Sequence, residues 1–265
     1  MRYSVYYKMK KIVALAFEEF GVADAPPLII LHGFFASSRN WRQIAKQLGS
    51  KFHVYVLDQR NHGASPHVPV MDYPSMASDL SAFLDEREIA SACLVGHSMG
   101  GKVAMWFALN HPERIARLIV VDIAPVAYRH NFDDIVKTLK ALPLDRIGNR
   151  KQADDFLSET ITEPGFRQFL LQNLILHEGN YRWRIDLDIF YQAAPNIVGF
   201  PDAGQLEPFG GEVLFVAGAN SAFVKKEAVF PLFPEASILS VPEAGHWVHA
   251  EQPVYFTQLV EAFCA

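Results

Sequence analysis

The sequence predicts an α/β fold, in which helices cover both faces of a mostly parallel sheet and a helical segment is inserted late in the chain. Three observations support this prediction. Short, fully apolar runs alternate with segments whose apolar residues recur at helical spacing, which is the pattern of a buried parallel sheet. One junction between such a run and a helix, at residues 96–100, has the sequence G-x-S-x-G. The alternation stops near residue 127 and resumes near residue 213.

Size and composition are those of one large domain with an insertion. The chain has 265 residues, 50% of them hydrophobic, which is enough for a large core. A net charge of −5 without a basic run argues against nucleic acid as a partner. No apolar run approaches the roughly 20 residues that span a bilayer, and the apolar stretch 12–17 is too short for an export signal. Cys93 and Cys264 provide no disulfide framework. We therefore expect a cytoplasmic protein.

The first half of the chain is expected to alternate strands with helices. The expected strands are residues 12–17, 28–31, 53–57, 92–95 and 117–122, and the expected helices are 41–48, 73–88 and 102–109. Each expected strand is a mainly apolar run, and most end at Gly, Asp or His, where the chain turns. Asn40 is expected to cap the first helix, because its side chain can accept a hydrogen bond from the first turn.

Between residues 127 and 207 no segment has the pattern of a strand. Segments 132–142, 151–160, 166–176 and 185–193 have helical spacing and are interrupted by prolines. Strands are expected again at 213–217 and 236–241, before a final helix from Pro253. We therefore expect an all-helical cap over residues 126–208, inserted into a core made of residues 1–125 and 209–265. An insertion at the carboxyl edge of the sheet would cover Ser98.

Ser98 is the predicted nucleophile. A strand that turns sharply into a helix holds the residue at the turn in a strained conformation, and Gly96 and Gly100 lack the Cβ atoms that would collide there. The Ser98 hydroxyl is then exposed at the carboxyl edge of the sheet. A glycine-rich turn without chemistry is the alternative, because G-x-S-x-G alone is a common sequence.

Five segments together resemble the α/β-hydrolase superfamily along the whole chain, and more narrowly the bacterial YbfF-type esterases. These segments are Leu31–Phe35, Asp58–Pro66, Gly96–Lys102, Val121–Pro125 and Ala244–Glu251. The resemblance implies an α/β-hydrolase fold and hydrolysis of esters or thioesters. It implies no cofactor, and no His, Cys or carboxylate cluster in the sequence has the spacing of a metal site.

A serine nucleophile needs a base, and the family order of serine, acid and histidine points to His246. His246 follows the last expected strand. His249 lies three residues later and is the alternative base. His97 is expected to pack beside Ser98 and to border the substrate pocket.

The expected acid is Asp122. Most of the superfamily places its acid after the next-to-last strand, where this chain has Gly218-Ala219-Asn220-Ser221 and no carboxylate. Asp122 ends the strand after the nucleophile, and neighbouring strands lie about 4.8 Å apart, so it can reach the same histidine. The resembled esterases place their acid after this strand. The alternatives are that Asp122 only caps the insertion, or that Asp58 is the acid; we expect Asp58 to form a structural Asp–Arg brace in its turn.

Two backbone amides are expected to form the oxyanion hole, those of Met99 and Phe34. The pocket is expected to involve Phe35, His97, Trp183, Tyr191 and Trp247, although most large apolar residues of the insertion must form its own core.

The sequence therefore predicts a serine esterase that acts on small-molecule acyl esters. Acyl thioesters are an alternative class of substrate. Carbon–carbon bond hydrolysis and perhydrolysis use the same residues and are alternatives. A ligand-binding protein without catalysis is the alternative outside enzymes. The sequence does not indicate the oligomeric state.

Overall fold

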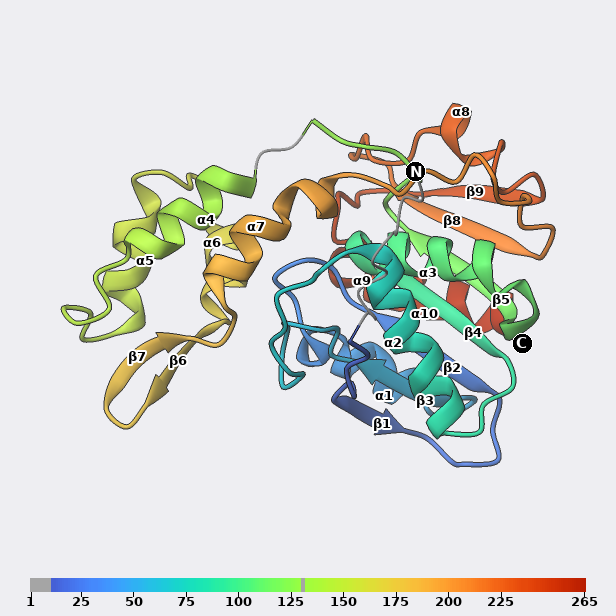
Figure 1. Cartoon of the computed structure of the whole chain (residues 1–265), viewed down its shortest axis with the longest axis horizontal. Helices are drawn as coiled ribbons and strands as arrows, with labels where there is room; N and C mark the ends of the chain where they lie inside the picture. The colour runs from blue at the N-terminus through green and yellow to red at the C-terminus, as the bar shows by residue number, and fades with distance from the viewer. Residues whose placement is uncertain (1–10, 130–131) are drawn as a thin grey trace, which may run out of the picture.

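The computed structural model describes residues 11–129 and 132–265 and contains a seven-stranded sheet in the order β1-β3-β2-β4-β5-β8-β9 (Figure 1). The strands are β1 (Phe17–Phe20), β2 (Pro27–Leu31), β3 (His53–Leu57), β4 (Ala92–His97), β5 (Ile115–Val121), β8 (Val213–Gly218) and β9 (Ala236–Val241). Only β1 runs antiparallel to its neighbour β3; the other pairs are parallel. This confirms the predicted α/β class with a mostly parallel sheet.

Helices cover both faces of this sheet. Helices α2 (Tyr73–Glu86) and α3 (Met99–Asn110) pack on one face, and α1 (Arg42–Leu48), α9 (Val248–Glu251) and α10 (Pro253–Cys264) on the other. Along β2, Ile29 and Leu31 point into the first layer of side chains, while Leu28 and Ile30 point into the second. Burial on both faces explains why these strands have continuous apolar sequences.

Two local predictions near the N-terminus were wrong. The first strand begins at Phe17 rather than at residue 12, because the amides of Val13 and Ala16 donate to the side chains of Asp79 and Ser65 instead of to a neighbouring strand. Asn40 does not cap α1. It lies in a 3-10 turn, η1 (Ser38–Trp41), where its side chain accepts a hydrogen bond from the Ser37 amide.

The segment between β5 and β8 lies to one side of the sheet (Figure 1). Its elements are α4 (Phe132–Ala141), α5 (Arg150–Ser158), α6 (Pro164–Leu171), β6 (Leu174–His177), β7 (Asn180–Trp183) and α7 (Leu187–Val198). The expectation of an all-helical insertion was therefore wrong, because β6 and β7 form a hairpin. The turn between them is Glu178-Gly179, both with positive φ, as favoured two-residue hairpin turns require. The division into a core and a cap at residues 126 and 208 remains a proposal.

Two further elements lie in the connections between strands. A small helix, α8 (Lys226–Val229), lies between β8 and β9, and the 3-10 turn η2 (Pro112–Arg114) leads into β5. Across the two described ranges, no helix combines the length and the apolar character that crossing a membrane requires.

Candidate active site

Ser98 lies at the junction of β4 and α3 in the predicted strained conformation, with φ 52° and ψ −116°. A Cβ atom at Gly96 would lie 2.4 Å from the Gly100 carbonyl oxygen, and one at Gly100 would lie 2.2 Å from the Leu31 carbonyl oxygen. Both distances are far shorter than van der Waals contact, so only glycine fits these two positions. The Ser98 amide donates to the Val121 carbonyl at 3.0 Å, which holds the turn against the end of β5.

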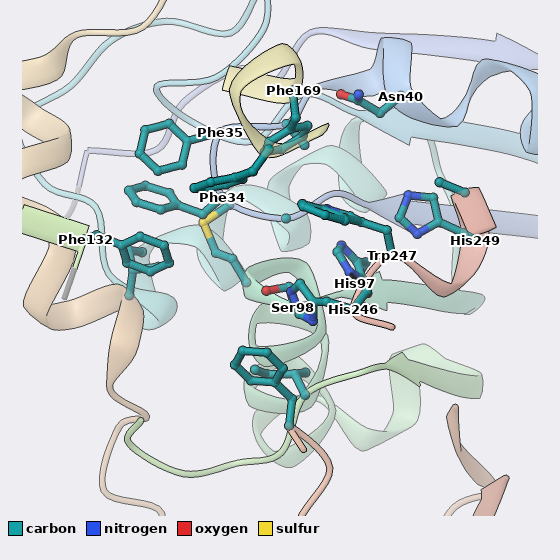
Figure 2. A pocket seen from close by; sticks show the side chains of 18 of the residues that line it. Phe34, Phe35, Asn40, His97, Ser98, Phe132, Phe169, His246, Trp247 and His249 are labelled. Atoms are coloured by element: carbon teal, nitrogen blue, oxygen red, sulfur yellow. Dashed lines mark hydrogen bonds between the residues drawn. The ribbon is translucent and has the colours of Figure 1, made fainter. Parts of the chain in front are cut away.

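Asp122 follows β5 directly and is completely buried. Its Oδ2 atom lies 2.8 Å from His246 Nδ1, which donates to it, and its Oδ1 atom accepts the Gly218 amide at 3.0 Å. The structure thus brings the predicted base and acid together across 124 residues of sequence. With Nδ1 donating to the carboxylate, Nε2 is the nitrogen that can take a proton from Ser98. Figure 2 shows Ser98 and His246 beside each other at the same cavity.

His249, the alternative base, has a different environment. Its ring stacks on Trp41 with a centroid separation of 4.0 Å, and its side chain is buried. Burial, followed by the charge of His246, lowers the pKa of His249 to about 3. A ring that resists protonation so strongly is a poor proton acceptor near neutral pH.

The carboxylate of Asp58, the alternative acid, is hydrogen-bonded to backbone amides. Its two oxygens accept the amides of Ser38 at 2.7 Å and Ala64 at 2.8 Å. The expected Asp58–Arg60 brace was wrong, because Arg60 forms its buried ion pair with Asp79 at 2.7 Å. Asp58 therefore shapes its turn, while Arg60 ties that turn to α2.

His97 lies between the turn at Ser98 and the loop of the base. Its Nε2 atom donates to the His246 carbonyl oxygen at 2.8 Å. Burial and the neighbouring His246 and His249 lower the pKa of His97 well below its ordinary value, so the ring stays neutral. His97 packs beside the serine and borders the cavity.

The loop after β2 and the start of α3 present the two amides expected to bind an oxyanion. Met99 is the first residue of α3, where backbone amides have no partner within the helix. Phe34 lines the same cavity as Met99 and follows Gly33, whose carbonyl accepts a hydrogen bond from His32 Nδ1 at 2.8 Å. Asn173, which the sequence analysis missed, donates from its side chain to the Phe35 carbonyl at 2.8 Å. This bond ties the loop to the insertion.

A cavity of about 630 Å³ opens over Ser98 between the sheet and the insertion (Figure 2). Most of its large side chains are aromatic: Phe34, Phe35, Trp41, Tyr73, Tyr128, Phe132, Phe166, Phe169, Phe223 and Trp247. Such a lining favours apolar groups of a ligand over charged ones. Among the expected pocket residues, Phe35, His97 and Trp247 line this cavity.

Trp183 and Tyr191 do not line the cavity, which corrects that part of the prediction. The Trp183 indole donates to the Leu139 carbonyl at 3.1 Å inside the insertion. Tyr191 is 38% exposed and lies beside Lys137 and Lys140. Its neighbour Phe190 takes the inward position on α7 instead, where it is fully buried and stacks on Phe34.

Lys102 is a buried cation at the base of the insertion, and the sequence analysis did not single it out. It lies on α3, four residues after Ser98, and its Nζ atom donates to the carbonyls of Val126 at 2.8 Å, Val198 at 2.9 Å and Gly199 at 2.5 Å. These carbonyls belong to the two segments that connect the insertion to the sheet. Burial lowers the pKa of Lys102 to about 7, and the three carbonyls favour the ammonium form against that loss of hydration.

Lys102→Met is expected to lower the free energy of unfolding by about 3 kcal/mol at pH 6, because three buried carbonyls lose a charged donor. Urea denaturation measures this change. Lys225→Met is the matched control, since Lys225 is exposed and also lies over the Tyr128 ring, 5.4 Å from its centroid. Equal stability of the two variants would show that Lys102 does not hold the insertion.

Comparisons with known proteins agree with this architecture. Residues 26–253 match the sequence model of a family described as the alpha/beta hydrolase fold. The chain is 40% identical over 256 residues to a mouse protein named sn-1-specific diacylglycerol lipase ABHD11, covering 92% of this chain and 83% of the relative. It is 36% identical over 231 residues to the esterase YbfF of Escherichia coli, covering 86% of this chain and 88% of the relative. A solved marine microorganism esterase superimposes with a TM-score of 0.89 at 38% identity, over 95% of this chain and 99% of the other.

Proposed function

The chain belongs to the α/β-hydrolase family, and from this we propose that it hydrolyses carboxylic esters with Ser98 as nucleophile, His246 as base and Asp122 as the orienting acid. The observation that carries the proposal is the 2.8 Å bond between His246 Nδ1 and the buried carboxylate of Asp122, with Ser98 at the adjacent strand end. Relatives named esterase and lipase support the same reaction class.

The proposed reaction has two halves. Ser98 Oγ attacks the ester carbonyl carbon while His246 Nε2 takes the hydroxyl proton, and the carboxylate of Asp122 stabilises the imidazolium that forms. The amides of Met99 and Phe34 donate to the oxyanion of the tetrahedral intermediate. When the intermediate collapses, His246 returns the proton to the departing alcohol and leaves an acyl group on Ser98. Water, deprotonated by His246, then releases the carboxylic acid and restores the hydroxyl.

The proposed substrates are small-molecule esters with an apolar acyl group. The aromatic lining of the cavity supports this choice, because burying an acyl chain there removes apolar surface from water. The mouse relative is named for diacylglycerol and the bacterial relative for ester hydrolysis, which is consistent with an uncharged acyl ester.

The test combines an active-site label with a panel of substrates. A fluorophosphonate probe is expected to label the protein once, on the peptide that contains Ser98, and not to label Ser98→Ala. p-Nitrophenyl esters of increasing acyl length are expected to be hydrolysed, with the best length set by the cavity. A folded protein that is neither labelled nor active on any ester or acyl thioester would overturn the proposal and favour a ligand-binding role.

A cytoplasmic location and the lack of a nucleic-acid partner are also part of this proposal. Both cysteines, Cys93 and Cys264, are free and buried, which is usual in a reducing compartment. Cell fractionation tests the location, and recovery only in a secreted fraction would contradict it.

A further inference from the structure

The ring of His97 supplies a hydrogen bond that the proposed reaction does not use. His97 is the last residue of β4 and directly precedes Ser98. Its Nε2 atom donates to the backbone carbonyl of His246 at 2.8 Å, across 149 residues of sequence. The predicted base is therefore bonded at two points, its side chain to Asp122 and its backbone to the residue beside the nucleophile.

The two residues that flank His246 are bonded within their own segment. The amides of Gly245 and Trp247 donate to the carboxylate of Glu251, at 2.6 and 3.2 Å. These bonds shape the loop, whereas the bond from His97 relates the loop to the nucleophile. The backbone of His97 is itself held in place, because β4 lies inside the sheet and pairs with β2 on one side and β5 on the other.

The ring of His97 has little freedom to move. It is buried, and its centroid lies 4.7 Å from that of His246 and 4.8 Å from that of His249 (Figure 2). A Cβ atom on Gly33 would lie 3.0 Å from His97 Nδ1, which is closer than ordinary van der Waals contact. One ring therefore contacts both the loop of the base and the loop that carries Phe34, and it belongs to the strand that ends at the nucleophile.

His97 donates its bond as a neutral group. Burial, followed by the charges of His246 and His249, lowers the pKa of His97 well below its ordinary value. A neutral imidazole has one N–H, and the bond to the His246 carbonyl places that hydrogen on Nε2. The ring thus adds no positive charge that would oppose an imidazolium on His246 during the proposed reaction.

We propose that His97 is a positioning residue, which holds the backbone of His246 at the distance from Ser98 that proton transfer requires. The inference rests on the proposed roles of Ser98 and His246. Asp122 fixes which nitrogen of His246 carries the proton, but a bond to the side chain alone allows the backbone of the loop to shift. Such shifts are costly, because a displacement of about 1 Å can lower the rate of a catalysed step about 100-fold.

The experiment compares two substitutions of similar size, only one of which keeps the donor. Glutamine can place its amide nitrogen where His97 has Nε2, whereas methionine has a similar length and no N–H. We expect His97→Met to lower kcat about 10- to 100-fold on the best ester of the panel, because the His246 carbonyl loses its donor and the base loses its position. KM should change less than about threefold, since Nε2 faces the backbone of the base and not the ester. His97→Gln is expected to keep kcat within about threefold of the wild-type value.

His53→Met is the matched control. His53 is also a buried histidine, but it is the first residue of β3, at the edge of the sheet opposite to Ser98, and its ring bonds to Glu19 at 2.5 Å. This variant should keep the wild-type kcat even where its melting temperature falls. If His97→Met does not fold, His97→Asn provides the same comparison with His97→Gln, because its shorter amide does not reach the carbonyl.

Two outcomes would overturn the positioning role while the esterase proposal stands. One is wild-type turnover in His97→Met. The other is an equal loss of turnover in His97→Met and His97→Gln with lowered melting temperatures in both, since the ring would then only fill space. Failure of the esterase proposal is recognised separately, by a wild-type protein without turnover or label.

Discussion

Ser98→Ala is expected to lower kcat for ester hydrolysis about a millionfold. The remaining rate is that of direct attack by water on an ester held by the oxyanion amides. The variant keeps the amides of Met99 and Phe34 and the whole cavity, so it should still bind the ester. It lacks the only hydroxyl placed at the end of β4, and no acyl-enzyme can form. Steady-state kinetics on the best ester of the panel, with mass spectrometry for the acyl-enzyme, measures the effect.

Ser237→Ala is the control for this substitution, since Ser237 is an exposed serine on β9. It should keep full activity. Alanine at position 98 must adopt the same positive φ as serine, so we expect the variant to fold as the wild type does. Its melting temperature checks this. A Ser98→Ala protein that keeps more than about one hundredth of the wild-type turnover would place the nucleophile elsewhere.

The sheet could be predicted from the sequence because its strands are buried on both faces. The runs at 28–31 and 92–95 are apolar at every position, and the run at 53–57 is apolar after His53. The structure places β2, β3 and β4 there within two residues. The G-x-S-x-G turn was equally clear, since its two glycines are required by contacts within the turn and with the end of β2. Local sequence and tertiary structure demand the same residues at these places.

The insertion was harder to predict because distant contacts decide its elements. Residues 166–176 have helical spacing throughout, yet α6 ends at Leu171. Asn173 then bonds to the carbonyls of Phe35 and Leu170 through its side chain, and its own carbonyl accepts the amide of Arg184. These partners hold the chain for the hairpin that follows. No pattern within residues 166–176 contains that information.

The pocket residues show the same limit. On α7, Phe190 and Tyr191 are adjacent aromatic residues, and one step along a helix turns a side chain by about 100°. The packing of α7 against α4 and Phe34 selects Phe190 for the buried face, and the composition of the insertion cannot show this. Lys102 and Ser221 likewise form hydrogen bonds with residues that lie 24 to 99 positions away along the chain.

The acid could be predicted because strand order determines which loops meet. β5 lies between β4 and β8, so the residue that follows it, Asp122, can lie near the nucleophile turn and near the loops that leave the same edge of the sheet. The structure indeed has Asp122 in contact with His246. The catalytic role of this contact remains a prediction, and a substitution that preserves shape can test it.

Asp122→Asn is expected to lower kcat about 10⁴-fold with little change in KM. Asparagine has nearly the same shape, but its amide can donate to His246 Nδ1 and so favour the tautomer with a proton on Nε2. That nitrogen then cannot take the proton of Ser98, and no negative charge stabilises the imidazolium. KM should change little, because Asp122 is completely buried behind His246 and does not line the cavity. Steady-state kinetics with the best ester gives both constants.

Asp58→Asn separates this role from the general cost of removing a buried carboxylate. Asp58 is also buried at the end of a strand, and its oxygens accept the amides of Ser38 and Ala64. Its replacement should lower the melting temperature while kcat falls less than about tenfold, because it has no bond to His246. The opposite pattern, with near-normal turnover in Asp122→Asn and a loss of about 10⁴-fold in Asp58→Asn, would transfer the acid to Asp58.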